Sequence, residues 1–178
     1  TFAKINNIRL HYKEAGEGDL ILFLHGFPEY SGIWKKQLSF FSKKGFHAVA
    51  LDLRGYNLSD KPKGIKSYDL EILMSDIIGL IKHLNKKKVI LVGHDWGGFL
   101  SWFIAMYHPN LVKKMVIINC PHPSLTKEGL KKFHVRTLLY LFFQLPIIPE
   151  LFTFFVGKRL FKRRLENIIS KKDLNNYM

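Results

Sequence analysis

A short apolar run that ends in a glycine-flanked turn is the feature that most limits what this chain can fold into. Residues 89–92 have the length and apolar character of a strand covered on both faces, and the next segment reads Gly93-His94-Asp95-Trp96-Gly97-Gly98. Glycine on either side of the turn lets a strand and a helix approach where larger side chains would separate them. The segment therefore predicts a strand, a tight turn with Asp95 at its tip, and a helix.

The same alternation runs through the first two thirds of the chain. We expect strands at residues 8–12, 20–24, 47–53, 89–92 and 115–119, and helices at 34–41, 68–84 and 96–107, with a turn-rich loop at 55–66. Strands and helices that alternate across short loops are typical of βαβ units and a parallel sheet. The predicted class is α/β, with a doubly wound, mostly parallel sheet.

The alternation of predicted strands and helices ends at Pro121-His122-Pro123, and the chain that follows is helical in pattern and rich in aromatic residues. Residues 138–156 are strongly apolar, but they include polar and helix-breaking residues that disfavour a membrane span: Gln144, Pro146, Pro149 and Glu150. We expect a packed helical lid instead. The predicted division is residues 1–121 as the first half of a core and residues 122–178 as the beginning of the lid.

The chain is basic, with 28 Lys and Arg against 14 Asp and Glu and a net charge of +14. Most of the lysines are scattered at turns and helix ends, and no nucleic-acid recognition motif accompanies them, so we expect no nucleic-acid partner. The densest basic run is Lys158-Arg159 with Lys162-Arg163-Arg164. Two interpretations stay open for it, an exposed helix face, which we favour, and peripheral contact with an anionic membrane.

Cysteine usage and the start of the chain bear on the compartment. Cys120 is the single cysteine, so no internal disulfide forms, and the start of the chain has the pattern of a strand rather than of a signal peptide. We expect an intracellular protein, cytoplasmic or associated with an internal membrane. The sequence makes no prediction of the oligomeric state.

Asp95 is the first candidate for chemistry. Parallel sheets place their sites at the carboxyl ends of the strands, and Gly93-x-Asp95-x-Gly97 has the small-x-nucleophile-x-small frame of a nucleophile elbow, with aspartate in the usual place of serine. The following helix directs its first N–H groups and its positive dipole end at this point. We predict that Asp95 is a nucleophile and that the backbone N–H of Trp96 helps to stabilise an oxyanion.

A second segment, His25-Gly26-Phe27-Pro28, follows an earlier predicted strand. If the turn at Asp95 resembles the nucleophile elbow of a hydrolase, this loop is expected to supply the other oxyanion donor, here the backbone N–H of Phe27. The alternative is that His25-Gly26 is simply a turn and Pro28 a helix start. Two further predicted βα units separate this segment from Asp95, and that arrangement favours the functional interpretation.

Three segments together resemble the epoxide hydrolase family of the α/β-hydrolase fold. They are His25-Gly26-Phe27-Pro28-Glu29, Asp52-Leu53-Arg54-Gly55-Tyr56-Asn57-Leu58-Ser59-Asp60-Lys61-Pro62 and Gly93-His94-Asp95-Trp96-Gly97-Gly98, in the family's order and spacing. The resemblance extends from about Ile8 into the lid segment. It implies that Asp95 attacks an epoxide carbon to give an alkyl-enzyme ester, which a histidine-activated water hydrolyses to a vicinal diol. It implies no metal or organic cofactor.

The sequence departs from the family pattern at two places within its length. The fourth residue of the Arg-Gly-Tyr-Gly loop is Asn57 instead of glycine, and asparagine tolerates the left-handed backbone better than most residues. The first lid tyrosine, which would donate to the epoxide oxygen, is expected at Leu139, and Tyr140 stands next to it. One residue rotates a helical side chain by about 100°, so Tyr140 is a candidate donor with both interpretations open.

The third departure is larger. The family's relay acid, catalytic histidine and second tyrosine follow the lid, whereas this sequence ends at Met178 inside the predicted lid, without the last strands of the sheet. Of the eight histidines none stands where the family's base belongs, and His94 is expected to pack or hydrogen-bond away from the substrate. The resemblance therefore implies an incomplete, inactive or single-turnover fragment.

Two other functions remain open. A haloalkane or haloacid dehalogenase of the same fold uses the same aspartate, but the dehalogenases with His-Gly-Asn-Pro carry an amide where Phe27 stands, which favours epoxides. A non-catalytic relative that binds a lipid or a partner is favoured by Leu139 and by the missing base. A small apolar epoxide is the expected substrate because the lid segment is aromatic (Phe142, Phe143, Phe152, Phe154 and Phe155).

Overall fold

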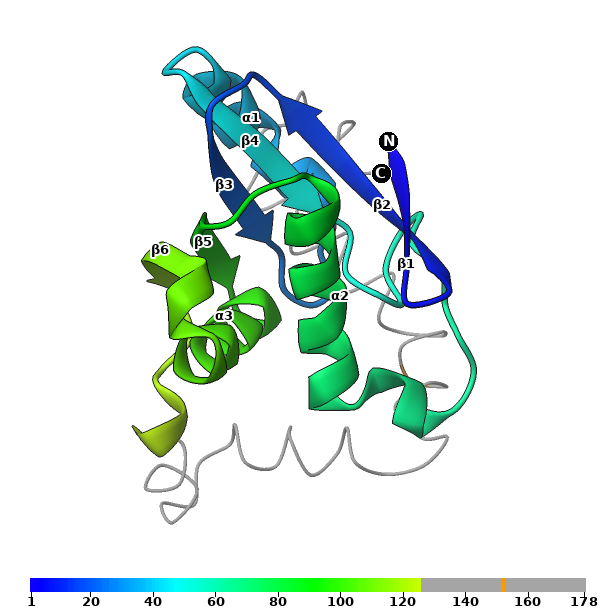
Figure 1. Cartoon of the computed structure of the whole chain (residues 1–178). Coiled ribbons are helices and arrows are strands. Elements are labelled where there is room, and N and C mark those ends of the chain that lie inside the picture. The colour runs from blue at the N-terminus through cyan, green and yellow to red at the C-terminus, as the bar shows by residue number, and fades with distance from the viewer. Residues whose placement is uncertain (126–151, 153–178) are drawn as a thin grey trace. The chain divides into compact units, whose positions relative to one another are not determined.

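The computed structural model describes residues 1–125 and residue 152 (Figure 1). The chain divides into two units at Pro123, and the fold given below is that of the first unit, Thr1–Pro123. Tyr140, the basic run at residues 158–164 and most of the expected lid lie outside the described residues. No helix in the described part is long and apolar enough to cross a membrane.

A six-stranded sheet forms the centre of the first unit. Its strands are β1 (Phe2–Ile5), β2 (Ile8–Ala15), β3 (Asp19–Leu24), β4 (Phe46–Leu51), β5 (Val89–His94) and β6 (Val112–Ile118), in the order β1-β2-β4-β3-β5-β6. The four strands from β4 to β6 pair in parallel, and β1 and β2 add two antiparallel pairings. The mostly parallel α/β sheet expected from the sequence is confirmed.

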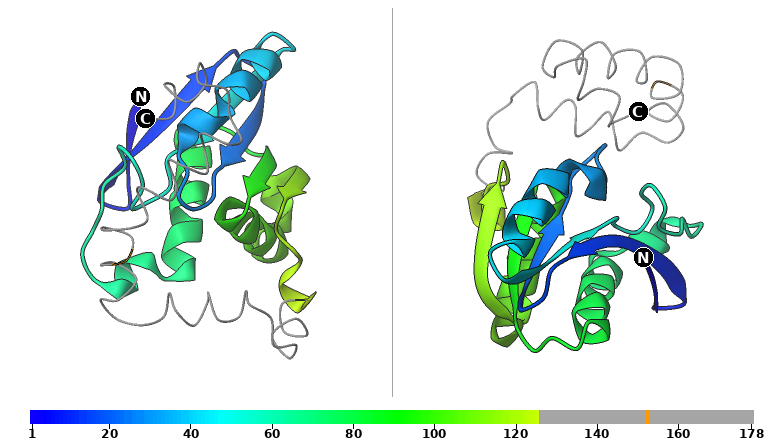
Figure 2. Two further views of the ribbon diagram at one scale, coloured as in Figure 1. Left: turned by 180° about the vertical axis from the view of Figure 1, so that it is seen from behind. Right: turned by 90° about the horizontal axis from the view of Figure 1, so that it is seen from above.

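Helices cover both faces of this sheet, as the doubly wound prediction requires. The turn η1 (Ser31–Trp34) and helix α1 (Lys35–Ser42) pack on the face that carries Ile21 and Phe23, while α2 (Leu70–His83) and α3 (Trp96–Tyr107) pack on the face of Leu20, Leu22 and Leu24. Figure 2 shows α1 and α2 on opposite sides of the strands. Residues 20–24 of β3 are buried on both faces, and this run is therefore apolar.

The start of the chain was expected to be a strand, but its division into β1 and β2 by a hairpin turn was not predicted. Asn6 and Asn7 have φ of 51° and 62° and form a two-residue turn that pairs Ile5 with Ile8. Turns with positive φ at both central residues match the twist of a β-hairpin, and asparagine is one of the few residues that adopt them. The strand prediction at residues 8–12 was also too short, because β2 continues to Ala15 against β4.

The bounds of other helices and strands differ by a few residues from those predicted. The short 3₁₀ turn η2 (Ile65–Tyr68) falls at the end of the expected loop, so α2 begins at Leu70. Strand β6 begins at Val112 and not at residue 115, because the two lysines after Val112 interrupt the apolar pattern of the strand. Another 3₁₀ turn, η3 (Pro109–Leu111), leads into it.

A buried ion pair fixes the loop that follows β4. The guanidinium of Arg54 meets the carboxylate of Asp76 on α2 through two bonds, Nε to Oδ2 at 2.6 Å and Nη2 to Oδ1 at 2.8 Å. The amide of Asn6 also donates to Asp76 Oδ1 at 2.8 Å. The paired carboxylate raises the pKa of Arg54. The pair stabilises the loop 52–60 at the carboxyl edge of the sheet, where the candidate site lies.

Candidate active site

The turn between β5 and α3 holds Asp95 in an unusual backbone conformation, with φ 50° and ψ −114°. A positive φ is uncommon for a residue with a side chain and costs free energy that the surroundings must supply. Two bonds fix the turn. The Asp95 N–H donates to Ile118 O at 3.1 Å, and the Phe99 N–H donates to Asp95 O at 2.9 Å. All other non-glycine residues with positive φ in the described part are asparagines: Asn6, Asn7, Asn57, Asn85 and Asn119.

Close packing explains the glycines around the turn. A Cβ on Gly93 would lie 2.4 Å from the carbonyl oxygen of Gly97, and a Cβ on Gly97 would lie 2.3 Å from that of Leu24. Real Cβ atoms do not make such contacts with backbone. Gly93 and Gly97 therefore let strand β5, helix α3 and the end of β3 meet around Asp95.

The loop after β3 lies directly against this turn. The backbone N–H of Phe27 donates to Asp95 Oδ1 at 3.2 Å, and the Gly97 N–H donates to His25 O at 3.0 Å. The peptide bond between Phe27 and Pro28 is cis. Trp96 is the first residue of α3, and among the described residues its N–H makes no hydrogen bond to the Asp95 carboxylate. Phe27 thus supplies the donor that already points at the predicted nucleophile.

His25 links two loops and is held neutral. Its Nδ1 lies 2.8 Å from Gly26 O and its Nε2 lies 3.0 Å from the N–H of Leu53, so Nδ1 carries the proton and Nε2 accepts. Burial lowers the pKa of His25 and outweighs the neighbouring acids. Both ring nitrogens are therefore used, and His25 is a connector between the loops after β3 and β4.

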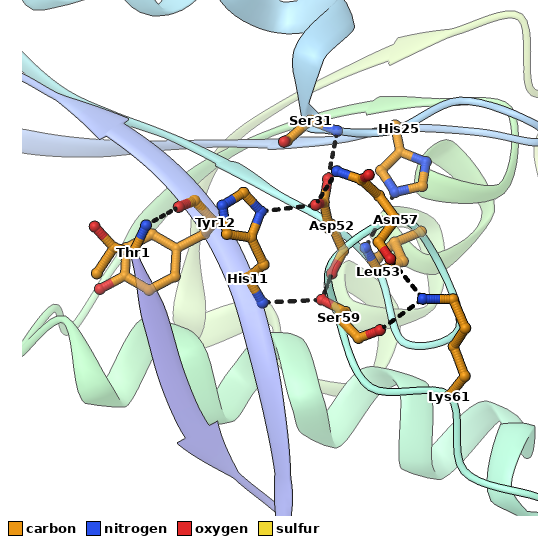
Figure 3. A network of polar contacts seen from close by, with 10 residues as sticks. All are labelled: Thr1, His11, Tyr12, His25, Ser31, Asp52, Leu53, Asn57, Ser59 and Lys61. Carbon is orange, nitrogen blue, oxygen red and sulfur yellow. Dashed lines mark hydrogen bonds and ion pairs between the residues drawn. The ribbon is translucent and has the colours of Figure 1, made fainter. Parts of the chain in front are cut away.

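Asp52, the first residue after β4, is the centre of a buried network that Figure 3 shows. Its carboxylate accepts hydrogen bonds, each of 2.7 Å, from the Ser31 N–H, from His11 Nδ1 and from Asn57 Nδ2. Burial alone would raise the pKa of Asp52, but these hydrogen bonds outweigh it and the pKa is lowered. The ionised carboxylate thereby joins β2, η1 and the loop 52–60.

Asn57 occupies the position of the family's glycine without breaking this loop. Its φ is 42°, which asparagine tolerates as expected from the sequence, and its side chain adds a bond to Asp52 that glycine would lack. The roles of Asp52 and His11 were not predicted from the sequence. The available signal was the place of Asp52 directly after a predicted parallel strand, at the edge where such sheets gather polar groups.

Glu29 and His94 form a second contact that was not predicted as a pair. His94 Nδ1 lies 2.8 Å from Glu29 Oε2, and the same oxygen accepts from the Gly26 N–H at 3.2 Å. The expected hydrogen bond of His94 is thus made to Glu29. Both residues stand next to predicted site residues, but nothing in the sequence says that they meet.

A cavity of about 590 Å³ lies beside the loop after β3. Its lining combines that loop, the loop after β4 and a tyrosine of η2: Phe27, Pro28, Glu29, Tyr30, Arg54, Gly55, Tyr56, Asn57 and Tyr68. Phe27 and Trp96 are both about half exposed, at 48% and 49%, although their rings are large and apolar. This end of the sheet thus presents an apolar surface around the Asp95 turn, which suits an apolar ligand.

The structure brings most of the predicted site residues together. His25, Gly26, Phe27 and Pro28 come from the loop after β3, and Gly93, Asp95, Trp96 and Gly97 come from the turn after β5. Direct hydrogen bonds join the two groups. Tyr140, the candidate donor from the lid, lies outside the described residues. The arrangement can hold a carboxylate nucleophile beside a backbone N–H donor.

Comparison with known proteins places this geometry in a family. The family model described as the alpha/beta hydrolase fold matches residues 19–166. The AB hydrolase superfamily protein YfhM of Bacillus subtilis (strain 168) is 44% identical over 154 residues, which cover 84% of this chain and 54% of that protein. Epoxide hydrolase 4 of Mus musculus is 43% identical over 152 residues, 83% of this chain and 42% of that protein.

Solved structures also include epoxide hydrolases that match this chain. The crystal structure of epoxide hydrolase VrEH1 from Vigna radiata matches with a TM-score of 0.83 and 33% identity, covering 93% of this chain and 53% of that one. The chain spans about half the length of each of these three proteins. The chain belongs to the α/β-hydrolase fold family, and its named relatives there include epoxide hydrolases.

Proposed function

We propose that these residues form the nucleophile and oxyanion half of an epoxide hydrolase site. In the first step a carboxylate oxygen of Asp95 attacks a ring carbon of the epoxide, and the bond between that carbon and the ring oxygen breaks. The ring oxygen leaves as an alkoxide and takes a proton from an acid, for which Tyr140 is the candidate. The product of this step is an ester between Asp95 and a hydroxyalkyl group.

One observation carries this proposal, the hydrogen bond of 3.2 Å from the Phe27 N–H to Asp95 Oδ1. A carboxylate oxygen that is held by a backbone donor is the poorer nucleophile, so Oδ2 attacks and Oδ1 becomes the carbonyl oxygen of the ester. When water adds to the ester carbon, negative charge develops on Oδ1, where the donor already points. The N–H of Trp96 would be the second donor to that oxyanion.

The second step needs a base to take a proton from water, and three described histidines already have partners. His25 uses both ring nitrogens, and His94 binds Glu29 through Nδ1. His11 is buried on Asp52. We infer that the described residues carry the reaction efficiently only as far as the ester, and that turnover requires a base other than these three histidines.

Mass spectrometry of the purified chain tests this proposal. After incubation with styrene oxide, an apolar epoxide, the peptide that contains Asp95 should gain the mass of one epoxide molecule. The Asp95→Asn variant keeps the shape of the side chain but lacks the carboxylate, so it should stay unmodified. A folded wild-type chain without label on Asp95, or equal labelling of the variant, would overturn the proposal.

A brominated alkane of similar size serves as the second reagent. Its attack by Asp95 would release bromide and give a related ester, which is the expectation for a dehalogenase. We expect faster labelling by the epoxide, because the named relatives include epoxide hydrolases. Faster labelling by the bromoalkane, with bromide release, would favour the dehalogenase instead.

A further inference from the structure

Glu29 contacts both peptide groups on either side of Gly26. Its carboxylate oxygen Oε2 accepts from the Gly26 N–H at 3.2 Å, and its backbone N–H donates to Gly26 O at 2.9 Å. The carbonyl of Gly26 belongs to the same peptide plane as the N–H of Phe27. Glu29 therefore constrains the plane that carries the oxyanion donor and the plane that precedes it.

This double contact matters because Gly26 is a glycine. Without a side chain, the backbone at Gly26 has more φ and ψ freedom than at any other residue type, so the two planes can rotate against each other unless something holds them. A rotation there would turn the Phe27 N–H away from Asp95 Oδ1. The side-chain bond from Glu29 is what fixes the first of the two planes.

The same carboxylate also joins this loop to the turn that holds the nucleophile. Glu29 Oε2 lies 2.8 Å from Nδ1 of His94, the residue before Asp95. Both side chains are largely buried, with 26% and 21% of their surfaces exposed, so solvent screens the contact only in part. The Phe27 donor and Asp95 come from loops after different strands, and Glu29 is a side-chain bridge between those loops.

We propose that Glu29, through His94 and Gly26, is a positioning residue that keeps the Phe27 N–H aligned with Asp95. The inference rests on the proposed function in one respect, the use of that N–H as an oxyanion donor. A residue in this role acts on the hydrolysis of the ester more than on its formation, because charge builds on Oδ1 when water adds to the ester carbon.

The chain offers a matched control for a test. Glu14 on β2 contacts His47 on β4 at the same distance, 2.8 Å from Oε2 to Nε2, in a pair away from the loop after β3 and the turn after β5. Glu14→Ala therefore removes a similar pair without touching the site. Glu29→Ala removes the bridge, and Glu29→Gln keeps an oxygen that can accept from Gly26 and His94.

The measurement is the lifetime of the Asp95 ester after excess styrene oxide is removed. Loss of a whole oxyanion donor slows such steps by about 100-fold or more, and a displaced donor should cost less, so we expect the ester of Glu29→Ala to decay about tenfold more slowly. Its formation should change less than its decay. Glu14→Ala should match the wild-type chain, and Glu29→Gln should recover most of the rate. Equal decay in Glu29→Ala and Glu14→Ala would overturn the proposal.

An amide NMR spectrum reads the alignment without any reaction. The Phe27 amide proton, which is bonded to a carboxylate, should move upfield in Glu29→Ala and in His94→Ala but not in Glu14→Ala. If the wild-type chain forms no ester, the proposed function fails while this shift still decides the role of Glu29. An unmoved Phe27 amide in both site variants would overturn the positioning role even if the ester forms.

Discussion

Gly26 lies so close to Asp95 that a Cβ at Gly26 would stand 2.5 Å from the Cβ of Asp95 and 2.8 Å from its Oδ1. No ordinary pair of side-chain atoms approaches to this distance, so the contact requires glycine. The relation joins the loop after β3 to the turn after β5 at the side chain that is proposed to react. Any added side chain at Gly26 must displace the nucleophile or the loop.

Gly26→Ala is therefore expected to slow labelling of Asp95 by an epoxide at least tenfold, since misplacement of a reacting group by about 1 Å can cost up to 100-fold in rate. Labelling would be followed by mass spectrometry over time. Gly64→Ala is the control, because Gly64 has φ 90° but open space around its Cβ position. That variant should lose some stability through backbone strain and keep the labelling rate. Equal rates for Gly26→Ala and the wild-type chain would contradict the proposed site geometry.

The neutral His25 should make stability depend on pH. Because burial lowers its pKa below the ordinary 6.5, the unfolded chain takes up a proton at His25 at a higher pH than the folded chain does. The contribution of neutral His25 is complete above pH 6.5 and is lost as the pH falls through that value towards the folded pKa.

Urea unfolding at about pH 7.5 and pH 5.5 checks this dependence. The loss of stability between the two conditions should be smaller in His25→Gln than in the wild-type chain. His83→Gln, which replaces an exposed histidine near the end of α2, should keep the wild-type difference. The same pH difference in all three proteins would show that His25 does not titrate as proposed.

The buried pair of Arg54 and Asp76 is expected to dominate the stability of the loop after β4. Arg54→Met leaves a buried carboxylate with only the Asn6 amide as a close donor, and the loss should be about 3–5 kcal/mol in the free energy of unfolding. Arg54→Lys keeps the charge but cannot make the bidentate contact with Asp76, and it should lose less free energy of unfolding than Arg54→Met. Chemical denaturation measures both. A loss below about 1 kcal/mol for Arg54→Met, the value of an exposed pair, would contradict this assignment.

Asn57→Gly restores the residue that the family pattern has at this place, yet we expect it to destabilise the chain. Glycine relieves the cost of the positive φ, worth about 1 kcal/mol, but removes a hydrogen bond to a buried carboxylate, worth about 1.5–3 kcal/mol. The net loss should be about 1 kcal/mol. Asn85→Gly is the control, because Asn85 has φ 55° and is exposed, and that change should be neutral or stabilising. A gain of stability in Asn57→Gly would refute the role of its amide.

Much of the site could be predicted because it depends on local backbone chemistry. The turn at Asp95 and the close packing at Gly93 and Gly97 follow from glycines at fixed positions next to an apolar strand. The loop at His25-Gly26 was placed by the order of the predicted strands. These features need only a segment and its neighbours in sequence.

The remaining features depend on where distant side chains meet. Glu29 meets His94 and Asp52 meets His11 only after β2, β3, β4 and β5 have aligned, and no periodicity encodes those contacts. The hairpin between β1 and β2 was not predicted for a different reason, because four residues before an Asn-Asn turn are too short a signal. The role of Tyr140 stays a prediction.

Asp95 and five asparagines of the described part all have a positive φ. In the described part of the chain, every other residue with a side chain and a positive φ is asparagine, and Asp95 differs from asparagine only in one terminal group. The turn would hold its shape with either residue. Reactivity in this lineage could then be lost or regained by a single exchange of an amide for an acid, with no refolding of the scaffold in between.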